Sequence, residues 1–234
     1  MRPLMSYFLA YYLRSYRYLF PVCAYVGFIL FVYSIVPNPV MDSYALSAML
    51  LFLVSAWISY GFVDLEHESQ RFVTAGRSGS AARYYGAKYL VMLGIGAALG
   101  MLAVAYPVAF DKFDRLPSFG EAAAAALGHL VLASLGITCA LWFSEKVVAS
   151  RTTAFFGLML VLAVSCGGKG LGEQLPEGVR GVLWLIPPVS RVTEILFRYD
   201  EISHAWTAFV LLLASFYSGI LLLAFIRVSR TKLF

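Results

Sequence analysis

Charge is scarce in this chain, and its scarcity argues against a soluble fold. Of the 234 residues, 13% are charged and 61% are hydrophobic, whereas roughly 25% of an average soluble domain is charged. The mean hydropathy of +0.78 is that of an integral membrane protein. The net charge of +5 comes without a basic run or basic-aromatic segment, so we expect no nucleic-acid partner.

Cysteine and the common catalytic motifs are also sparse. Cys23, Cys139 and Cys166 stand singly, with no C-x-x-C, and their odd number gives no disulfide framework. The three histidines show no H-E-x-x-H or other paired metal-ligand spacing. We therefore expect no catalytic residues and no metal in this chain, and we interpret His129 as a packed, hydrogen-bonded side chain.

A nucleotide-binding motif is missing as well. The stretch CGGKG at 166–170 resembles part of a phosphate-binding loop, but the motif needs Gly at 163 and Ser or Thr at 170. The chain has Ala163 and Gly170. If ATP drives this protein, we expect ATP and magnesium to bind to a partner chain, and this chain to contain no cofactor.

Long apolar runs are what the sequence does contain. They predict one all-α transmembrane domain, 1–234, because about six spans of ~20 residues fit this length. The predicted spans are residues 21–37, 45–63, 86–110, 121–143, 152–166 and 205–226. The fifth run is short, and a Gly- and Pro-interrupted segment follows it, which predicts a re-entrant helical hairpin on the outer side within 167–203.

The basic residues predict the orientation. With both termini in the cytoplasm, twelve Lys and Arg lie inside and six outside, as the positive-inside rule favours. The inner set is Arg2, Arg14, Arg17, Arg71, Arg77, Arg83, Lys88, Lys146, Arg151, Arg227, Arg230 and Lys232, and the outer set is Lys112, Arg115, Lys169, Arg180, Arg191 and Arg198. We expect a multi-pass protein of the cell membrane with lipid around it.

Residues 1–20 mix Tyr, Leu and Phe with two arginines, Arg14 and Arg17, spaced three apart. Tyrosine favours the headgroup region, and arginine extends its charge to the membrane surface. This pattern predicts an amphipathic helix in the inner interface, although an ordinary cytoplasmic extension of the first span would also fit.

The densest charge lies at residues 64–88, DLEHESQRFVTAGRSGSAARYYGAK. Its acids come first, which suits the positive end of a helix dipole, and Gly76 is a suitable end for that helix. Ser78 or Ser80 can cap the next helix, which enters the third span. The segment 64–83 is therefore predicted to be a short cytoplasmic helix, a tight break and a return to the membrane.

Three features together resemble the membrane-spanning subunits, or permeases, of type-2 ATP-binding-cassette exporters. They are the interfacial helix before six spans, the acidic start DLEHES followed by GRSGSAARYYGAK, and the segment LPEGVRGVLWLIPPVSRVTEIL at 175–196. The resemblance implies a cytoplasmic coupling helix between spans two and three, and short outer helices between spans five and six. It also implies a second permease, identical or paralogous, and separate cytoplasmic ATPase subunits.

The resemblance assigns expected roles to individual residues. Contacts with the ATPase are expected from Asp64, Glu66, Glu68, Arg71, Phe72 and Arg77. In the outer hairpin, Pro187, Arg191 and Glu194 are expected to shape an exit gate. The expected function is export of a hydrophobic or amphipathic cargo, such as a peptide, an antibiotic, a lipid or a lipid-linked glycan.

Two other function classes stay open from the sequence. One is a polytopic protein that transports nothing, such as an assembly scaffold or an intramembrane enzyme. The other is an ion-coupled secondary transporter, for which ionisable residues near the middle of the membrane are expected. The centres of the six runs carry almost none, which favours the ATP-driven exporter.

Overall fold

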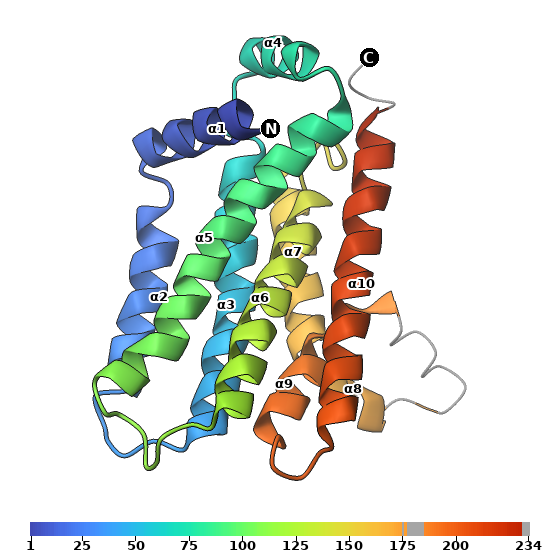
Figure 1. Ribbon diagram of the computed structural model, residues 1–234. Helices are drawn as coiled ribbons and strands as arrows, with labels where there is room; N and C mark the ends of the chain where they lie inside the picture. Colours follow the sequence, from blue (N-terminus) through green and yellow to red (C-terminus); the bar gives the residue numbers. More distant parts are fainter. Residues whose placement is uncertain (175, 177–184, 231–234) are drawn as a thin grey trace.

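The computed structural model describes residues 1–174, 176 and 185–230, and in these the regular structure is helical (Figure 1). Asn38 and Phe113 form one isolated bridge. The helices are α1 (Arg2–Ser15), α2 (Leu19–Val32), α3 (Val40–Val63), α4 (Glu68–Ser78), α5 (Ala81–Ala109), α6 (Phe119–Leu141), α7 (Arg151–Cys166), α8 (Gly168–Gln174), α9 (Val189–Phe197) and α10 (His204–Arg230). The prediction of an all-α protein is confirmed.

Four of these helices are long and apolar enough to cross a membrane by themselves: α3, α5, α6 and α10. The bent pair of α1 and α2 makes a fifth candidate, with 81° between its two parts, and α7 is an apolar helix of 16 residues. Six apolar helices thus lie near the six predicted positions. The membrane character is supported, whereas six complete spans stay a prediction.

Helices α3 and α6 form the centre of the bundle and share its most extensive helix contact. Glycine makes this approach possible, since a Cβ on Gly136 would lie 2.2 Å from the carbonyl oxygen of Phe52. Gly96 and Gly100 of α5 face Ala133 and His129 of α6. The G-x-x-x-G at 96–100 therefore packs two helices of the same chain against each other.

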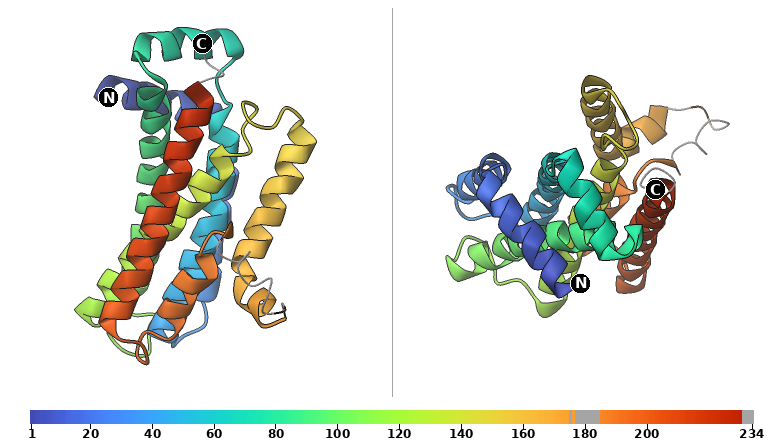
Figure 2. Two further views of the ribbon diagram at one scale, coloured as in Figure 1. Left: turned by 90° about the vertical axis from the view of Figure 1, so that its right-hand side faces the viewer. Right: turned by 90° about the horizontal axis from the view of Figure 1, so that it is seen from above.

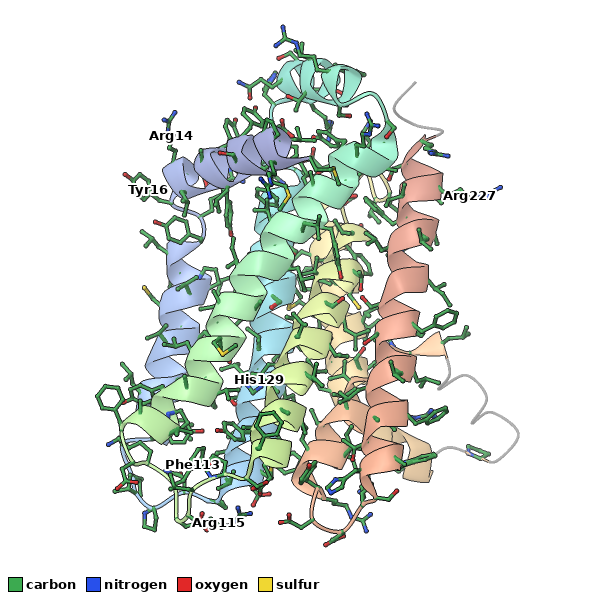
Figure 3. The ribbon with its side chains drawn as sticks, in the orientation of Figure 1. Arg14, Tyr16, Phe113, Arg115, His129 and Arg227 are labelled. Carbon is green, nitrogen blue, oxygen red and sulfur yellow. The ribbon has the colours of Figure 1, made fainter. Side chains whose placement is uncertain are left out.

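One end of the bundle carries the two helices that do not run along it. Figure 1 shows α1 and α4 lying across this end, with α4 outermost, and Figure 2 shows the same arrangement from the side and from above. We call it the α4 end. Arg14, Tyr16 and Arg227 lie there, while Phe113 and Arg115 lie at the opposite end (Figure 3). Arg14 and Arg227 of the expected inner set thus lie at the α4 end, and Arg115 of the expected outer set lies at the opposite end. Which end faces the cytoplasm stays a prediction.

The bounds of α4 differ from the predicted ones. The helix begins at Glu68 rather than at Asp64, continues through Gly76, and ends at Ser78. Its C-cap is Gly79, whose φ of 76° is left-handed. The prediction of Gly76 as the helix end was wrong, because Gly79 supplies the left-handed residue that terminates a helix. Ser80 then caps α5 by accepting a hydrogen bond from the Arg83 amide at 3.2 Å, as predicted.

The opposite end is fixed by a capping box that begins α6. The Ser118 hydroxyl accepts from the Glu121 amide, and the Glu121 carboxylate accepts from the Ser118 amide at 2.7 Å. Arg115 donates to the same carboxylate at 2.8 Å. The short helices α8 and α9 lie at this end, within the predicted hairpin 167–203; residues 175 and 177–184 of that hairpin lie outside the described residues.

Candidate functional site

Helix α4 has one face against the protein and one face exposed. Arg71 and Ala75 are buried on the inner face. Phe72 and Val73 are more than half exposed on the outer face, where Arg77 also lies. The six residues expected to contact an ATPase therefore lie in two environments, one against the rest of the protein and one exposed.

Glu66 lies on the inner side, although it was expected at a partner surface. Its Oε2 is 2.9 Å from Lys88 Nζ, and both side chains are 1% exposed. The same oxygen accepts from the Tyr84 hydroxyl, and Oε1 accepts from the Tyr7 hydroxyl at 3.4 Å. One carboxylate in the connection between α3 and α4 thus binds side chains from α1 and α5.

Lys88 joins this carboxylate to the end of α3. Its ammonium donates to the Val63 carbonyl oxygen at 2.8 Å, one of the carbonyls that a helix leaves without an intrahelical partner. A positive charge at this position also suits the negative end of the α3 dipole. Rings of Phe8, Phe62 and Tyr84 lie 4.7–5.8 Å from Nζ, so the buried ammonium is surrounded by partners.

Asp64 forms a second link on the inner side. Its carboxylate lies 3.5 Å from an Arg71 guanidinium nitrogen and accepts from the Glu145 amide at 2.7 Å. Burial raises the pKa of Asp64, while the Glu145 amide, Lys88 and Arg71 oppose that rise. Asp64 therefore connects the end of α3 to α4 and to the loop between α6 and α7.

The outer face of α4 carries the groups still available to a partner. Glu68 is exposed in its first turn, and Phe72 is 54% exposed and Val73 57%. The Lys146 ammonium, from the loop between α6 and α7, lies 5.9 Å from the centre of the Phe72 ring. Apolar side chains beside charged ones make up the kind of surface that protein partners cover.

The predicted exit-gate residues lie at the opposite end, around a cavity of about 190 Å³. Pro187, Arg191 and Glu194 all line it, together with residues of α8 and α10. Glu194 Oε1 accepts from Lys169 Nζ at 2.9 Å and lies 3.8 Å from Arg198. Glu194 therefore links α9 to α8, and a gate function stays a prediction.

An apolar groove of about 710 Å³ lies along the bundle between α2, α3 and α7. Its lining includes Phe28 of α2, Trp57 of α3, and Phe155 and Met159 of α7. No ionisable carboxylate, lysine or arginine is among the lining residues. Such a groove suits an apolar ligand or a second membrane helix.

His129 is packed and hydrogen-bonded, as expected. Its Nδ1 donates to the Ala125 carbonyl at 2.7 Å, and its Nε2 lies 3.0 Å from the Ser47 hydroxyl. Within the described parts of the chain, no group of three or more His, Cys, Asp or Glu could hold a metal ion. No family model, curated protein or solved structure matches this chain.

The sequence reasoning missed two residues of the inner cluster, Lys88 and Tyr84. Both stood in the segment YYGAK, but Lys88 was interpreted only as a cytoplasmic positive charge. A signal existed, since Lys88 falls eight residues inside the helix that Ser80 caps, where a lysine needs a partner if it is buried. The identity of that partner, Glu66, depends on how the chain folds back.

Proposed function

We propose that this chain is the membrane-spanning subunit of an ATP-driven exporter and that α4 is its coupling helix. The observation that supports this most directly is the two-sided character of α4. Its inner side is joined to α3 and α5 by the pairs Glu66–Lys88 and Asp64–Arg71, and its outer side exposes Phe72. A helix that receives force needs both an exposed docking face and firm attachment to what it moves.

The contacts define a path for that force. A displacement of α4 acts on the connection 64–67, and Lys88 ties this connection to the last carbonyl of α3 and to the second turn of α5. Because buried, hydrogen-bonded pairs resist separation, α3 and α5 would move together with α4. Glu66, Asp64 and Arg71 thus act within the subunit, and Glu68 and Phe72 take the role of partner contacts. Arg77, which was also expected to contact the ATPase, lines a groove between α1, α4 and α5.

The cargo proposed for this exporter is hydrophobic or amphipathic. The groove between α2, α3 and α7 offers aromatic and aliphatic walls along the bundle, and these walls would bind such a cargo by van der Waals packing, which drives association within lipid. In the full assembly, two permeases and two ATPase subunits would complete the pathway. Six spans, with the α4 end in the cytoplasm, belong to this proposal.

The decisive experiment measures docking of an ATPase on the Phe72 face. The chain is reconstituted into nanodiscs with a candidate partner ATPase, chosen as a protein with a Walker motif that co-purifies with it, and ATP hydrolysis is measured with and without the permease. Phe72→Asp should remove the stimulation, because a charge replaces a large apolar contact at the centre of the proposed interface. Since Phe72 is exposed, the variant is expected to remain folded and monodisperse.

Phe119→Asp is the matched control, since Phe119 is 91% exposed at the opposite end of the bundle. It should leave stimulation at the wild-type level. If Phe72→Asp stimulates the ATPase as well as wild type and Phe119→Asp do, α4 does not couple the two subunits. Loss of stimulation in both variants would equally contradict the assignment of the docking face to α4.

A further inference from the structure

A second groove, of about 560 Å³, lies at the α4 end between α1, α4 and the start of α5. Its volume is within the roughly 300–1,000 Å³ typical of ligand pockets. Leu4 and Tyr7 of α1 and Val73 of α4 supply apolar walls, and Arg77 and Arg83 supply two guanidinium groups. The proposed coupling role of α4 does not account for this combination of apolar and basic lining.

The two arginines lack acidic partners. Neither Arg77 nor Arg83 belongs to an ion pair among the residues that the structure describes, and no acidic side chain lines the groove. Both are exposed. Two unpaired positive charges beside apolar walls are complementary to an anion that has an apolar body.

Helix α1 indicates where the groove lies relative to the membrane surface. This helix lies across the bundle end, 81° from α2 (Figure 1), as an interfacial helix lies in the plane of a membrane surface. Its Met1 side chain is 3.7 Å from the Cβ position of Gly86, and Arg83 lies one helical turn beyond Gly86, toward α4. With α1 in the membrane interface, as expected from its sequence, Arg83 would be at the level of the phospholipid phosphates.

The exposed face of α5 continues from Arg83 into the apolar part of the bundle. Leu90, Gly94 and Met101 are exposed along this face, at the spacing of one helix side. Gly94 lies about 16 Å from Arg83 along the helix axis, and apart from its own chain neighbours and helix backbone no atom lies within 4 Å of its Cβ position. An acyl chain under a headgroup at Arg83 would find an open, apolar surface there.

We propose that Arg77 and Arg83 hold the phosphate of an anionic phospholipid from the cytoplasmic leaflet, with one acyl chain along the exposed face of α5. Anionic lipids concentrate in that leaflet and attract basic groups at the membrane surface. The inference rests on the membrane placement of the α4 end and goes beyond the proposed transport function. It requires no ATPase subunit.

The test measures binding of phosphatidylglycerol and phosphatidylcholine to the purified full chain by native mass spectrometry. Wild type should retain phosphatidylglycerol in preference to phosphatidylcholine. Arg83→Gln should weaken phosphatidylglycerol binding about five-fold, and Arg77→Gln together with Arg83→Gln about 25-fold. Arg14→Gln removes the same charge from an exposed position on α1 outside this groove and should bind as wild type does.

A further variant separates a lipid from a bare phosphate group. Gly94→Leu fills the open surface on α5 and should weaken long-chain phosphatidylglycerol while leaving the dihexanoyl form unaffected. Unchanged long-chain binding in this variant would overturn the acyl-chain placement.

If Arg83→Gln and Arg14→Gln bind phosphatidylglycerol equally, the lipid site is wrong. If Arg83→Gln lowers only the affinity for the ATPase, the groove docks a protein. The lipid-binding measurements need no ATPase, so failure of the lipid site is distinguishable from failure of the Phe72 experiment.

Discussion

The buried pair of Glu66 and Lys88 offers the sharpest test of how α4 is attached to the membrane helices. Lys88→Met leaves the Glu66 carboxylate buried with only tyrosine hydroxyls as partners. Glu66→Gln removes the negative charge and leaves the ammonium with a neutral amide oxygen, the Val63 carbonyl and three aromatic rings, but without a counter-ion. Each change removes the charge of one member of an ion pair in which both side chains are 1% exposed.

The expected cost follows from that burial. Removing one partner of a buried ion pair costs about 3–5 kcal/mol, because the remaining charge keeps its desolvation penalty without compensation. For a chain of this size, 1 kcal/mol corresponds to about 2–4 °C in Tm, so each single variant should unfold about 6–20 °C below wild type. The double variant Glu66→Gln with Lys88→Met should lose about 1–3 kcal/mol less than the sum of the singles.

Thermal unfolding of the purified chain in detergent, followed by size-exclusion chromatography of heated samples, measures these shifts. Arg14→Gln controls for loss of charge at an exposed position and should shift Tm by less than about 2 °C. Two results would refute the reasoning. One is a Lys88→Met variant as stable as the control, and the other is a double variant whose loss equals the sum of the single losses.

Three further changes test other parts of the fold by the same thermal assay. Gly136→Ala should lower the free energy of unfolding by about 1–3 kcal/mol or more, since the new Cβ would lie 2.2 Å from a carbonyl oxygen of α3. The control Gly219→Ala adds a Cβ with nothing within 4 Å and should not destabilise the protein. Equal effects of the two variants would contradict the α3–α6 contact. Ser118→Ala removes the cap of α6 and should cost about 1 kcal/mol, so an unchanged Tm would show that the capping box contributes nothing. Asp64→Asn should lower the free energy of unfolding much less than Glu66→Gln does. The neutral amide oxygen of Asn still accepts from the Glu145 amide, and burial already raises the pKa of Asp64. A larger loss of stability in Asp64→Asn would show that the charge of Asp64 is needed.

The positions of the helices could be predicted because each apolar run is a local feature of the chain. Six apolar helices, four of them long enough to span a membrane by themselves, lie within about five residues of the predicted runs. Ser80 caps α5, as its side-chain type suggested. The bounds of α4 were predicted less accurately. Gly76 and Gly79 are equally able to end a helix, and the left-handed conformation falls on Gly79.

The candidate site was predicted only in part. The segment 64–83 contains a short helix between the long apolar helices α3 and α5, as predicted, and Phe72 is exposed on it. The environments of Glu66 and Arg71 were not foreseen, because burial depends on neighbours from α1 and α5 that are distant in sequence. A charged residue at the end of an apolar run gives the same local pattern whether it faces water or a buried partner.

The sequence by itself determined that this chain is an all-helical membrane protein, since a chain so poor in charge cannot cover a soluble surface and must satisfy its backbone within helices. Only the tertiary structure decided which charges face outward. Folding of α5 beneath α1 brings Lys88 to Glu66 and to the end of α3. Among the residues that the structure describes, Arg77 and Arg83 have no acidic partner at the groove that they line. Which charges form ion pairs depends on the residues that the fold brings together and not on their separation in the sequence. Basic side chains in one short segment are therefore buried in an ion pair in one case and exposed at a groove in another.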